Sequence, residues 1–507
     1  MKEGIIMKKL MTLALAAAMM LGAATGANAI DFKAKGQWIM DFNYGMHGDF
    51  AKSKAAGNSG FSRNKNHEDE FEATQRVRLQ LDAVASEALS GTVFFEIGDQ
   101  VWGDNDNGGA LGADGKFVEL KRAYIDWMVP QTDLKVRMGI QGIQLPNVAG
   151  GSAILDDDVA AVTASYQFNE NVGLTAFWAR PYNDNNGYSY GNGHGKWGQN
   201  YMDNMDMFAV LLPLTFDGVK VTPWVMYAAM GPGMFNDGGT TKNGNAWTRA
   251  STGMISGFKG TDWNDTYGNA FWAGVTGEVT YWDPFRIAWD VNYGSAAYAD
   301  EKMNREGWLA SLLLEYKLDW GTPGLYGWYS TGDDNNPRNG SERMPYLSVA
   351  NVHNAWSHYA FNGNEYISRE GAVGNGMPGT WGVGLQLRDV NVIEDLYQTF
   401  RVNLIGGTND PGMAKWLSSQ GLAANSGALS GTVGMDGLYL TRQDYALEWG
   451  LTSTTKVTEN FTVALDVAYV ALWLDHDSSV WGNSRMNGRN DEVRDAWNFS
   501  LSYMYSF

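Results

Sequence analysis

A strict alternation of apolar and polar side chains from Trp497 to Phe507 constrains the fold of this chain more than any other feature. The apolar set is Trp497, Phe499, Leu501, Tyr503, Tyr505 and Phe507, and the intervening set is Asn498, Ser500, Ser502, Met504 and Ser506. Successive side chains on a β-strand point to opposite faces. A period of two sustained over this length therefore predicts a strand with one apolar face and one mostly polar face.

The same alternation recurs along the chain with charged residues on the polar face. One set pairs Phe71, Ala73, Val77, Leu79 and Leu81 with Glu72, Thr74, Arg76, Arg78, Gln80 and Asp82. Similar runs cover Leu134–Ile140, Phe285–Tyr293 and Trp381–Arg388. They approach the ~9–11 residues that cross a bilayer at a tilt, whereas strands of soluble sandwiches have about 5–6. A soluble barrel or β-helix is the alternative.

The N-terminal segment has the layout of a secretory signal peptide. Lys8 and Lys9 precede an apolar run from Leu10 to Ala24, and the small-residue triplet Ala27-Asn28-Ala29 follows. This order predicts cleavage after Ala29 and a mature chain from Ile30 to Phe507. No later apolar stretch reaches the ~20 residues of a spanning helix, so strands must do any membrane crossing.

Tight and long connections alternate between the predicted strands. The tight turns are Pro130-Gln131-Thr132-Asp133, Asn169-Glu170-Asn171, Asp217-Gly218, Asp283-Pro284 and Thr458-Glu459-Asn460. Long stretches rich in Gly and Asn run over Gly231–Tyr267, Gly332–Gly379 and Gly407–Leu438. Residues 30–507 are therefore expected to form one all-β domain, a transmembrane antiparallel β-barrel with short periplasmic turns and long extracellular loops. The segmentation predicts about 18 strands, with 16 possible if one hairpin is misread.

Composition excludes several classes of protein. The chain has no Cys, which removes zinc-thiolate sites and Cys nucleophiles. Its formal net charge of −19 opposes binding to nucleic acid, which rests on neutralising phosphates. The 21 Trp, 24 Tyr and 21 Phe suit a barrel with aromatic girdles at both membrane interfaces.

Catalytic, metal and cofactor motifs are not found. The six histidines, at positions 47, 67, 194, 353, 358 and 476, fall in predicted loops, and no Ser–His arrangement is indicated. His67-Glu68-Asp69-Glu70 lacks the second His of a zinc helix. The run from Asp104 to Gly109 resembles half of a calcium loop, but Gly115 stands where such a loop places Glu. We predict no enzymatic activity, cofactor or metal centre, and leave open a loose calcium site.

Residues on the polar faces are the candidate pore-lining residues. In the first third of the chain they are basic: Arg76, Arg78, Arg122, Lys135 and Arg137. Because Lys121 and Arg122 are adjacent they are expected to face opposite ways, with Arg122 inward beside Tyr124 and Asp126. The connection through Pro146–Gly151 is expected to fold inward and place Asp156, Asp157 and Asp158 opposite this basic wall. Opposed charges would create a transverse field across a narrow lumen, with weak net selectivity.

Three segments resemble the homotrimeric outer-membrane porins of sulfate-reducing bacteria: Ile30–Gly36, Glu119–Trp127 and Trp497–Phe507. The resemblance implies a water-filled channel in the outer membrane for passive diffusion of small hydrophilic solutes and ions. It implies a homotrimer surrounded by outer-membrane lipid, each chain with its own pore narrowed by an inward-folded loop. It also implies that Phe507 is part of the signal read by the barrel-assembly machinery.

Two alternatives from other functional classes remain. The first is a substrate-specific channel for a sugar or an oxyanion, in which aromatic side chains line the path, with Trp272 as its best support. The second is a barrel that is not a channel, an adhesin or structural protein with a plugged lumen and loops that bind external partners.

Overall fold

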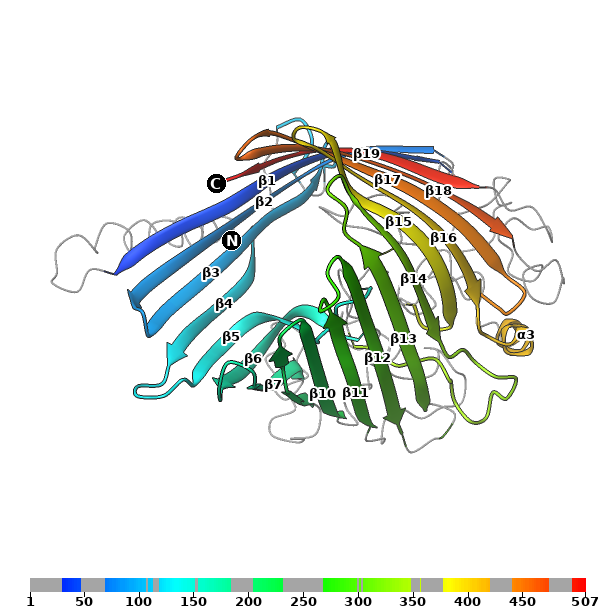
Figure 1. Cartoon of the computed structure of the whole chain (residues 1–507), viewed down its shortest axis with the longest axis horizontal. Coiled ribbons are helices and arrows are strands. Elements are labelled where there is room, and N and C mark those ends of the chain that lie inside the picture. Colours follow the sequence, from blue (N-terminus) through cyan, green and yellow to red (C-terminus); the bar gives the residue numbers. More distant parts are fainter. Residues whose placement is uncertain are drawn as a thin grey trace.

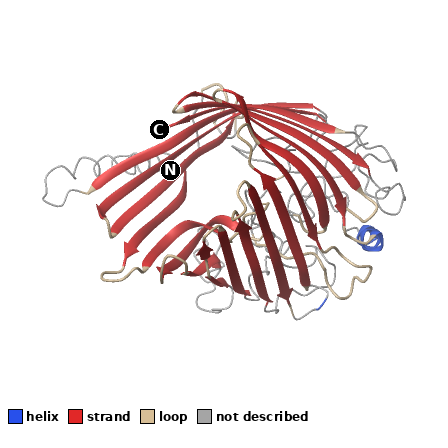
Figure 2. Cartoon of the chain, viewed as in Figure 1, coloured by secondary structure: helices blue, strands red, loops and turns tan. Residues whose placement is uncertain are grey.

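Strands make up nearly all of the described part of the chain in the computed structural model of the protein (Figures 1 and 2). The structure describes residues 30–46, 69–105, 108–112, 118–150, 154–183, 204–230, 268–298, 301, 304–347, 356, 377–419, 440–473 and 495–507. Within these residues, no helix is long and apolar enough to cross a membrane.

The strand segments are long, as the alternating patterns predict. Their bounds are β1 Asp31–Met46, β2 Asp69–Ser86, β3 Leu89–Val101, β4 Val118–Met128, β5 Lys135–Gln144, β6 Asp156–Gln167, β7 Gly173–Asn183, β8 Asn204–Leu211, β9 Leu214–Phe216, β10 Val219–Met230, β11 Gly268–Val279, β12 Phe285–Ala297, β13 Arg305–Tyr316, β14 Thr322–Ser330, β15 Thr380–Ile393, β16 Leu396–Gly407, β17 Tyr445–Thr458, β18 Phe461–Trp473 and β19 Ala496–Ser506. One helix, α3, covers Pro411–Ser419.

The sheet closes on itself because β1 pairs antiparallel with both β2 and β19, which lie beside it in Figure 1. Asp41 of β1, for example, is opposite Thr74 of β2 and Ser502 of β19. Closure satisfies the backbone N–H and C=O groups that an open sheet edge would leave unpaired in lipid. The predicted antiparallel barrel is confirmed by this pairing.

Segments β8 and β9 occupy one position in the barrel wall. Both pair with β10, and the chain between them contains Pro213, which has no N–H to donate to the ladder. The carbonyl of Pro213 still accepts a hydrogen bond from the Gly173 amide, at 3.0 Å. The 19 segments found in the described residues therefore form 18 wall strands, as predicted, and the alternative of 16 is wrong.

The two faces of the wall differ as the alternation predicts. On β19, Phe499 and Tyr505 are exposed on the outside, whereas Ser500 and Ser502 are buried on the inside. On β13, Trp308 and Leu312 are exposed while Ser311 and Glu315 are buried. Apolar side chains thus face the position of lipid, and polar side chains face the lumen.

Connections also alternate as expected along the described chain. The five predicted tight turns join β4 to β5, β6 to β7, β9 to β10, β11 to β12 and β17 to β18. The stretch Gly332–Gly379 separates β14 from β15. The long connection predicted over Gly407–Leu438 starts on the last residue of β16 and contains α3.

Several sequence predictions lie outside the described residues. They are the signal peptide of residues 1–29, all six histidines and the stretch Gly231–Tyr267.

Gly36 is tightly packed at the barrel closure, and we predict that Gly36→Ala lowers the stability of the barrel. A Cβ at this position would lie 2.5 Å from Cζ of Phe507 and 2.6 Å from the backbone oxygen of Arg78. The expected cost is about 1–3 kcal/mol, because the backbone contact cannot be relieved by a rotamer change. It is measured as a lower temperature for the gel-mobility shift that marks barrel unfolding in SDS. Gly91→Ala is the control, since its Cβ would meet nothing nearer than 4.0 Å. Equal temperatures for both variants would contradict the prediction.

Candidate functional site in the barrel lumen

The connection between β5 and β6 folds into the lumen and reaches another part of the barrel wall. The amides of Val148 and Ala149 donate to the carboxylate of Asp290 on β12, at 3.1 and 2.5 Å. The Ser311 hydroxyl on β13 donates to the Ala149 carbonyl at 2.6 Å. Thr276 also donates to Asp290, which is buried. The inward course of this connection is therefore as expected from the sequence.

A second inward segment, residues 341–347, packs against the first. The Leu347 amide donates to the Ile154 carbonyl at 2.9 Å. Arg305 of β13 donates through Nε to the Arg343 carbonyl at 2.8 Å and through Nη2 to the Met344 carbonyl at 2.9 Å. The two segments share one apolar cluster with inward side chains of β8, β10, β11 and β14. Part of the lumen is thus filled by protein.

Trp272 does not support a path lined by aromatic side chains. It points inward from β11, as predicted, but it is fully buried and its indole N–H donates to the Pro345 carbonyl at 2.8 Å. Trp272 holds the second inward segment, and its predicted place on a sugar path is wrong.

The basic residues of β2 and β5 lie on the inner wall, and each has a carboxylate neighbour. Arg76 Nε lies 2.5 Å from Asp99 Oδ1, and Arg78 Nε lies 2.6 Å from Glu96 Oε2. Arg137 contacts both Asp126 oxygens, each at 2.7 Å, and Lys135 Nζ lies 3.6 Å from the same carboxylate. These pairs offset most of the positive charge that the sequence places on this wall.

Lys121 and Arg122 do not face opposite ways, contrary to the alternation rule. The register of β4 against β3 shifts between Leu120, opposite Phe95, and Arg122, opposite Phe94. This bulge adds a residue on β4, and both side chains reach Asp158, at 3.3 Å for Lys121 and 2.5 Å for Arg122. Arg122 faces inward as expected. Lys121 was predicted to face the other way, but it points to the same carboxylate as Arg122.

The acidic run Asp156, Asp157 and Asp158 is not opposite the basic wall. It forms the start of β6 and pairs with Gly142–Gln144 of β5. Asp158 binds Lys121 and Arg122 of β4, which is two strands away across β5, and Asp156 accepts a hydrogen bond from the Gln144 side-chain amide at 3.1 Å. Instead of the predicted transverse field across the lumen, Asp158 forms ion pairs with cations on the same part of the wall.

Sequence reasoning missed a second charged group on the inner wall. Arg286 of β12 lies 3.0 Å from Glu278 and 2.8 Å from Glu315, and Glu315 also pairs with Arg388 of β15. The predicted alternation puts Arg286 and Arg388 on the polar faces of their strands. Their shared contact with Glu315 depends on the register between strands, which the sequence pattern does not give. Asp290 was missed for the same reason, although it lies on the polar face of the predicted run Phe285–Tyr293, and Glu96 lies on a strand for which no alternation was predicted.

Potential metal ligands do not gather in the described residues, where no group of three His, Cys, Asp or Glu could hold an ion. The run from Asp104 to Gly109 is described only in part, and there the Gly109 amide donates to the Asp104 carbonyl at 2.9 Å.

No family model matches this chain, and no curated protein matches its sequence. Among solved structures, it is similar to OccAB3 of Acinetobacter baumannii, with 9% identity, a TM-score of 0.49 and coverage of 94% of this chain and 100% of that one. A BenF-like porin from Pseudomonas fluorescens Pf-5 gives 8% identity, a TM-score of 0.49 and coverage of 94% and 99%. Pseudomonas aeruginosa OpdQ gives 10%, 0.48, 94% and 98%. The barrel fold of this chain rests on its own strand pairing.

Proposed function

We propose that this chain is a porin of a Gram-negative-type outer membrane, a water-filled channel for passive diffusion of small hydrophilic solutes and ions. The observation that carries the proposal is a closed antiparallel barrel with exposed apolar side chains outside and charged pairs inside. A lumen lined by ion pairs and hydroxyls suits hydrated solutes. The inward segment at Val148 and Ala149 narrows that lumen in the manner expected of a diffusion channel.

Conductance of the purified protein in a planar lipid bilayer tests this proposal. We expect stepwise increases in current at a constant voltage, each from one inserted channel or assembly, with conductance rising in proportion to salt concentration. Protein that inserts into bilayers but gives no steps would contradict the porin proposal. It would favour the plugged barrel, for which the two inward segments are the structural argument.

The homotrimer remains a proposal that rests on the sequence resemblance to porins of sulfate-reducing bacteria. Light scattering in detergent, corrected for bound detergent, should give three times the chain mass. A single-chain mass with full conductance would overturn it.

Phe507 is proposed to guide assembly as well as to close the barrel. Its amide and carbonyl both bond with Gly36, each at 3.0 Å, and its ring lies 5.2 Å from that of Trp38. We predict that Phe507→Ser lowers the amount of protein in the outer membrane, whereas Phe507→Tyr, which keeps the ring contact, leaves it unchanged. The level is measured by quantitative blotting of membrane fractions. Equal levels of the Ser variant and the unaltered protein would contradict the assembly role.

A further inference from the structure

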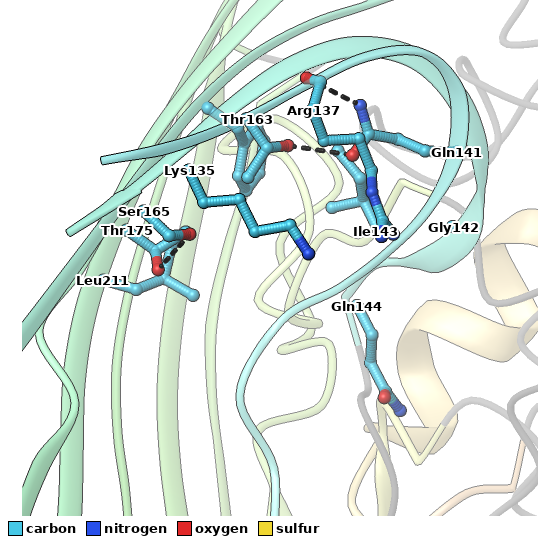
Figure 3. A pocket seen from close by; sticks show the side chains of 11 residues that line it. Lys135, Arg137, Gln141, Gly142, Ile143, Gln144, Thr163, Ser165, Thr175 and Leu211 are labelled. Carbon is cyan, nitrogen blue, oxygen red and sulfur yellow. Dashed lines mark hydrogen bonds between the residues drawn. The ribbon is translucent and has the colours of Figure 1, made fainter. Parts of the chain in front are cut away.

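A pocket of about 290 Å³ lies on the lumen side of β5, β6 and β7 (Figure 3). Its basic lining residues are Lys135 and Arg137. Its hydroxyl residues are Thr163, Ser165 and Thr175, and amides come from Gln141 and Gln144. Cavities of about this size and above accommodate small organic ligands, with a few polar groups that fix the ligand's orientation.

The pocket carries an excess of positive charge. Among the described residues, two cations line it and no carboxylate does, because Asp126, which pairs with Arg137, stands on β4 outside the lining. Lys135 shares that same carboxylate at 3.6 Å, too long for a strong hydrogen bond. Its side chain is 47% exposed, and in Figure 3 its amino group points into the pocket. One acid group of a solute can therefore meet Lys135 without breaking an existing strong pair.

Arg137 offers a second fixed donor for the same acid group. Its Nε and Nη2 bind Asp126, and its guanidinium carbon lies 4.1 Å from the centre of the Tyr124 ring. Nη1 has no hydrogen-bond partner among the described residues. The guanidinium is held in place from two sides, so little conformational entropy is lost when it binds a carboxylate.

The rest of the lining is suited to hydroxyl groups. The Ser165 and Thr175 hydroxyls lie 3.0 Å apart, so one of the two hydrogens is donated between them and the other remains for a ligand. Thr163 donates to Gln141 Oε1 at 3.1 Å and keeps its oxygen as an acceptor. These groups lie along the same inner face as the two cations, since Lys135 is opposite Ser165 and Arg137 is opposite Thr163.

We propose that this pocket binds polyhydroxylated organic acids of sugar size, such as sugar acids, as they pass through the lumen. The carboxylate meets Lys135 and Arg137, and the hydroxyl groups meet Thr163, Ser165 and Thr175. This inference rests on the proposed porin function, because it takes the lumen as the route of the solute. Binding in the pocket would give a general diffusion channel a preference for this class of solute.

Calorimetric titration of the purified full-length mature protein in detergent tests the pocket with three probes. Sodium gluconate carries the acid and the hydroxyls, sorbitol has the hydroxyls alone, and hexanoate has the acid alone. We expect gluconate to bind about tenfold or more tighter than either of the others, since a charged hydrogen bond contributes roughly one factor of ten. Equal affinities for gluconate and sorbitol would overturn the proposal.

Matched variants locate the binding. Lys135→Gln and Arg137→Gln should each weaken gluconate binding by about tenfold. Ser165→Ala combined with Thr175→Ala should weaken gluconate and leave hexanoate unchanged. Lys220→Gln is the control, since Lys220 is an exposed cation on β10 outside the pocket. Lys135→Gln keeps the test valid if Arg137→Gln fails to fold. Unaltered gluconate binding by Lys135→Gln would overturn the proposal.

Bilayer conductance distinguishes failure of the proposed pocket from failure of the proposed porin function. A channel that conducts but does not bind gluconate leaves the porin function in place and refutes only the pocket. A protein that binds gluconate but gives no conductance steps refutes the porin function, and with it the passage of solute past the pocket.

Discussion

Asp290→Ala is expected to raise single-channel conductance and its noise while leaving β-sheet content unchanged. The carboxylate of Asp290 accepts the Val148 and Ala149 amides and a hydroxyl hydrogen from Thr276, and it is 1% exposed. Hydrogen bonds to a charged group contribute about 1.5–3 kcal/mol each, and the two amides would lose their partner in a buried site. The inward segment then loses roughly 2–5 kcal/mol of anchoring and samples positions farther from β12.

A matched variant separates this effect from a general loss of lumen charge. Asp82→Ala removes a carboxylate that bonds Gln80 and Thr92 on its own part of the wall and reaches neither inward segment. We expect its conductance noise to equal that of the unaltered protein. Asp290→Asn should be intermediate, because its amide oxygen still accepts one hydrogen bond. If Asp290→Ala matched the unaltered protein in conductance and noise, Ser311 and Leu347 alone would hold the segment.

Local patterns predicted the wall of the barrel because each strand carries its own two-faced signal. The alternation from Trp497 to Phe507 became β19, and the charged alternation from Phe71 to Asp82 became part of β2. Turn residues such as Asp217-Gly218 and Asp283-Pro284 fall where strands reverse. The position of each strand and the face to which each side chain points follow from residues that are neighbours in sequence, which is why a single sequence predicts them.

Partners across the barrel could not be predicted in the same way. Val148 meets Asp290 across 142 positions of sequence, and only the register of every strand between them sets that contact. A single bulge at Lys121 changed which way a cation points, and no local pattern marked it. The carboxylate neighbours of the basic residues are also set by register. The sequence alone therefore led to too high a positive charge for the inner wall.

Charge selectivity depends on those pairs. An ion in the lumen experiences the sum of an arginine and its carboxylate, and a pair 2.5–2.7 Å apart acts as a small dipole rather than as a free charge. Removing one partner leaves a full charge on the wall. At about 8 Å and an effective dielectric near 40, one such charge changes the energy of a permeating ion by about 1 kcal/mol, or roughly fivefold in relative permeability.

The triple variant Arg76→Gln, Arg78→Gln and Arg137→Gln should therefore shift the reversal potential in a salt gradient strongly toward cations, because Asp99, Glu96 and Asp126 lose their arginine partners. The mirror variant Asp99→Asn, Glu96→Gln and Asp126→Asn should shift it toward anions. The unaltered channel should lie between them with weak selectivity. Gel-mobility shifts in SDS check that both variants still form barrels, since unpaired charges near the buried Arg76 destabilise the wall. Folded variants that all share one reversal potential would place these pairs away from the narrowest section of the lumen, where the field that selects ions is focused.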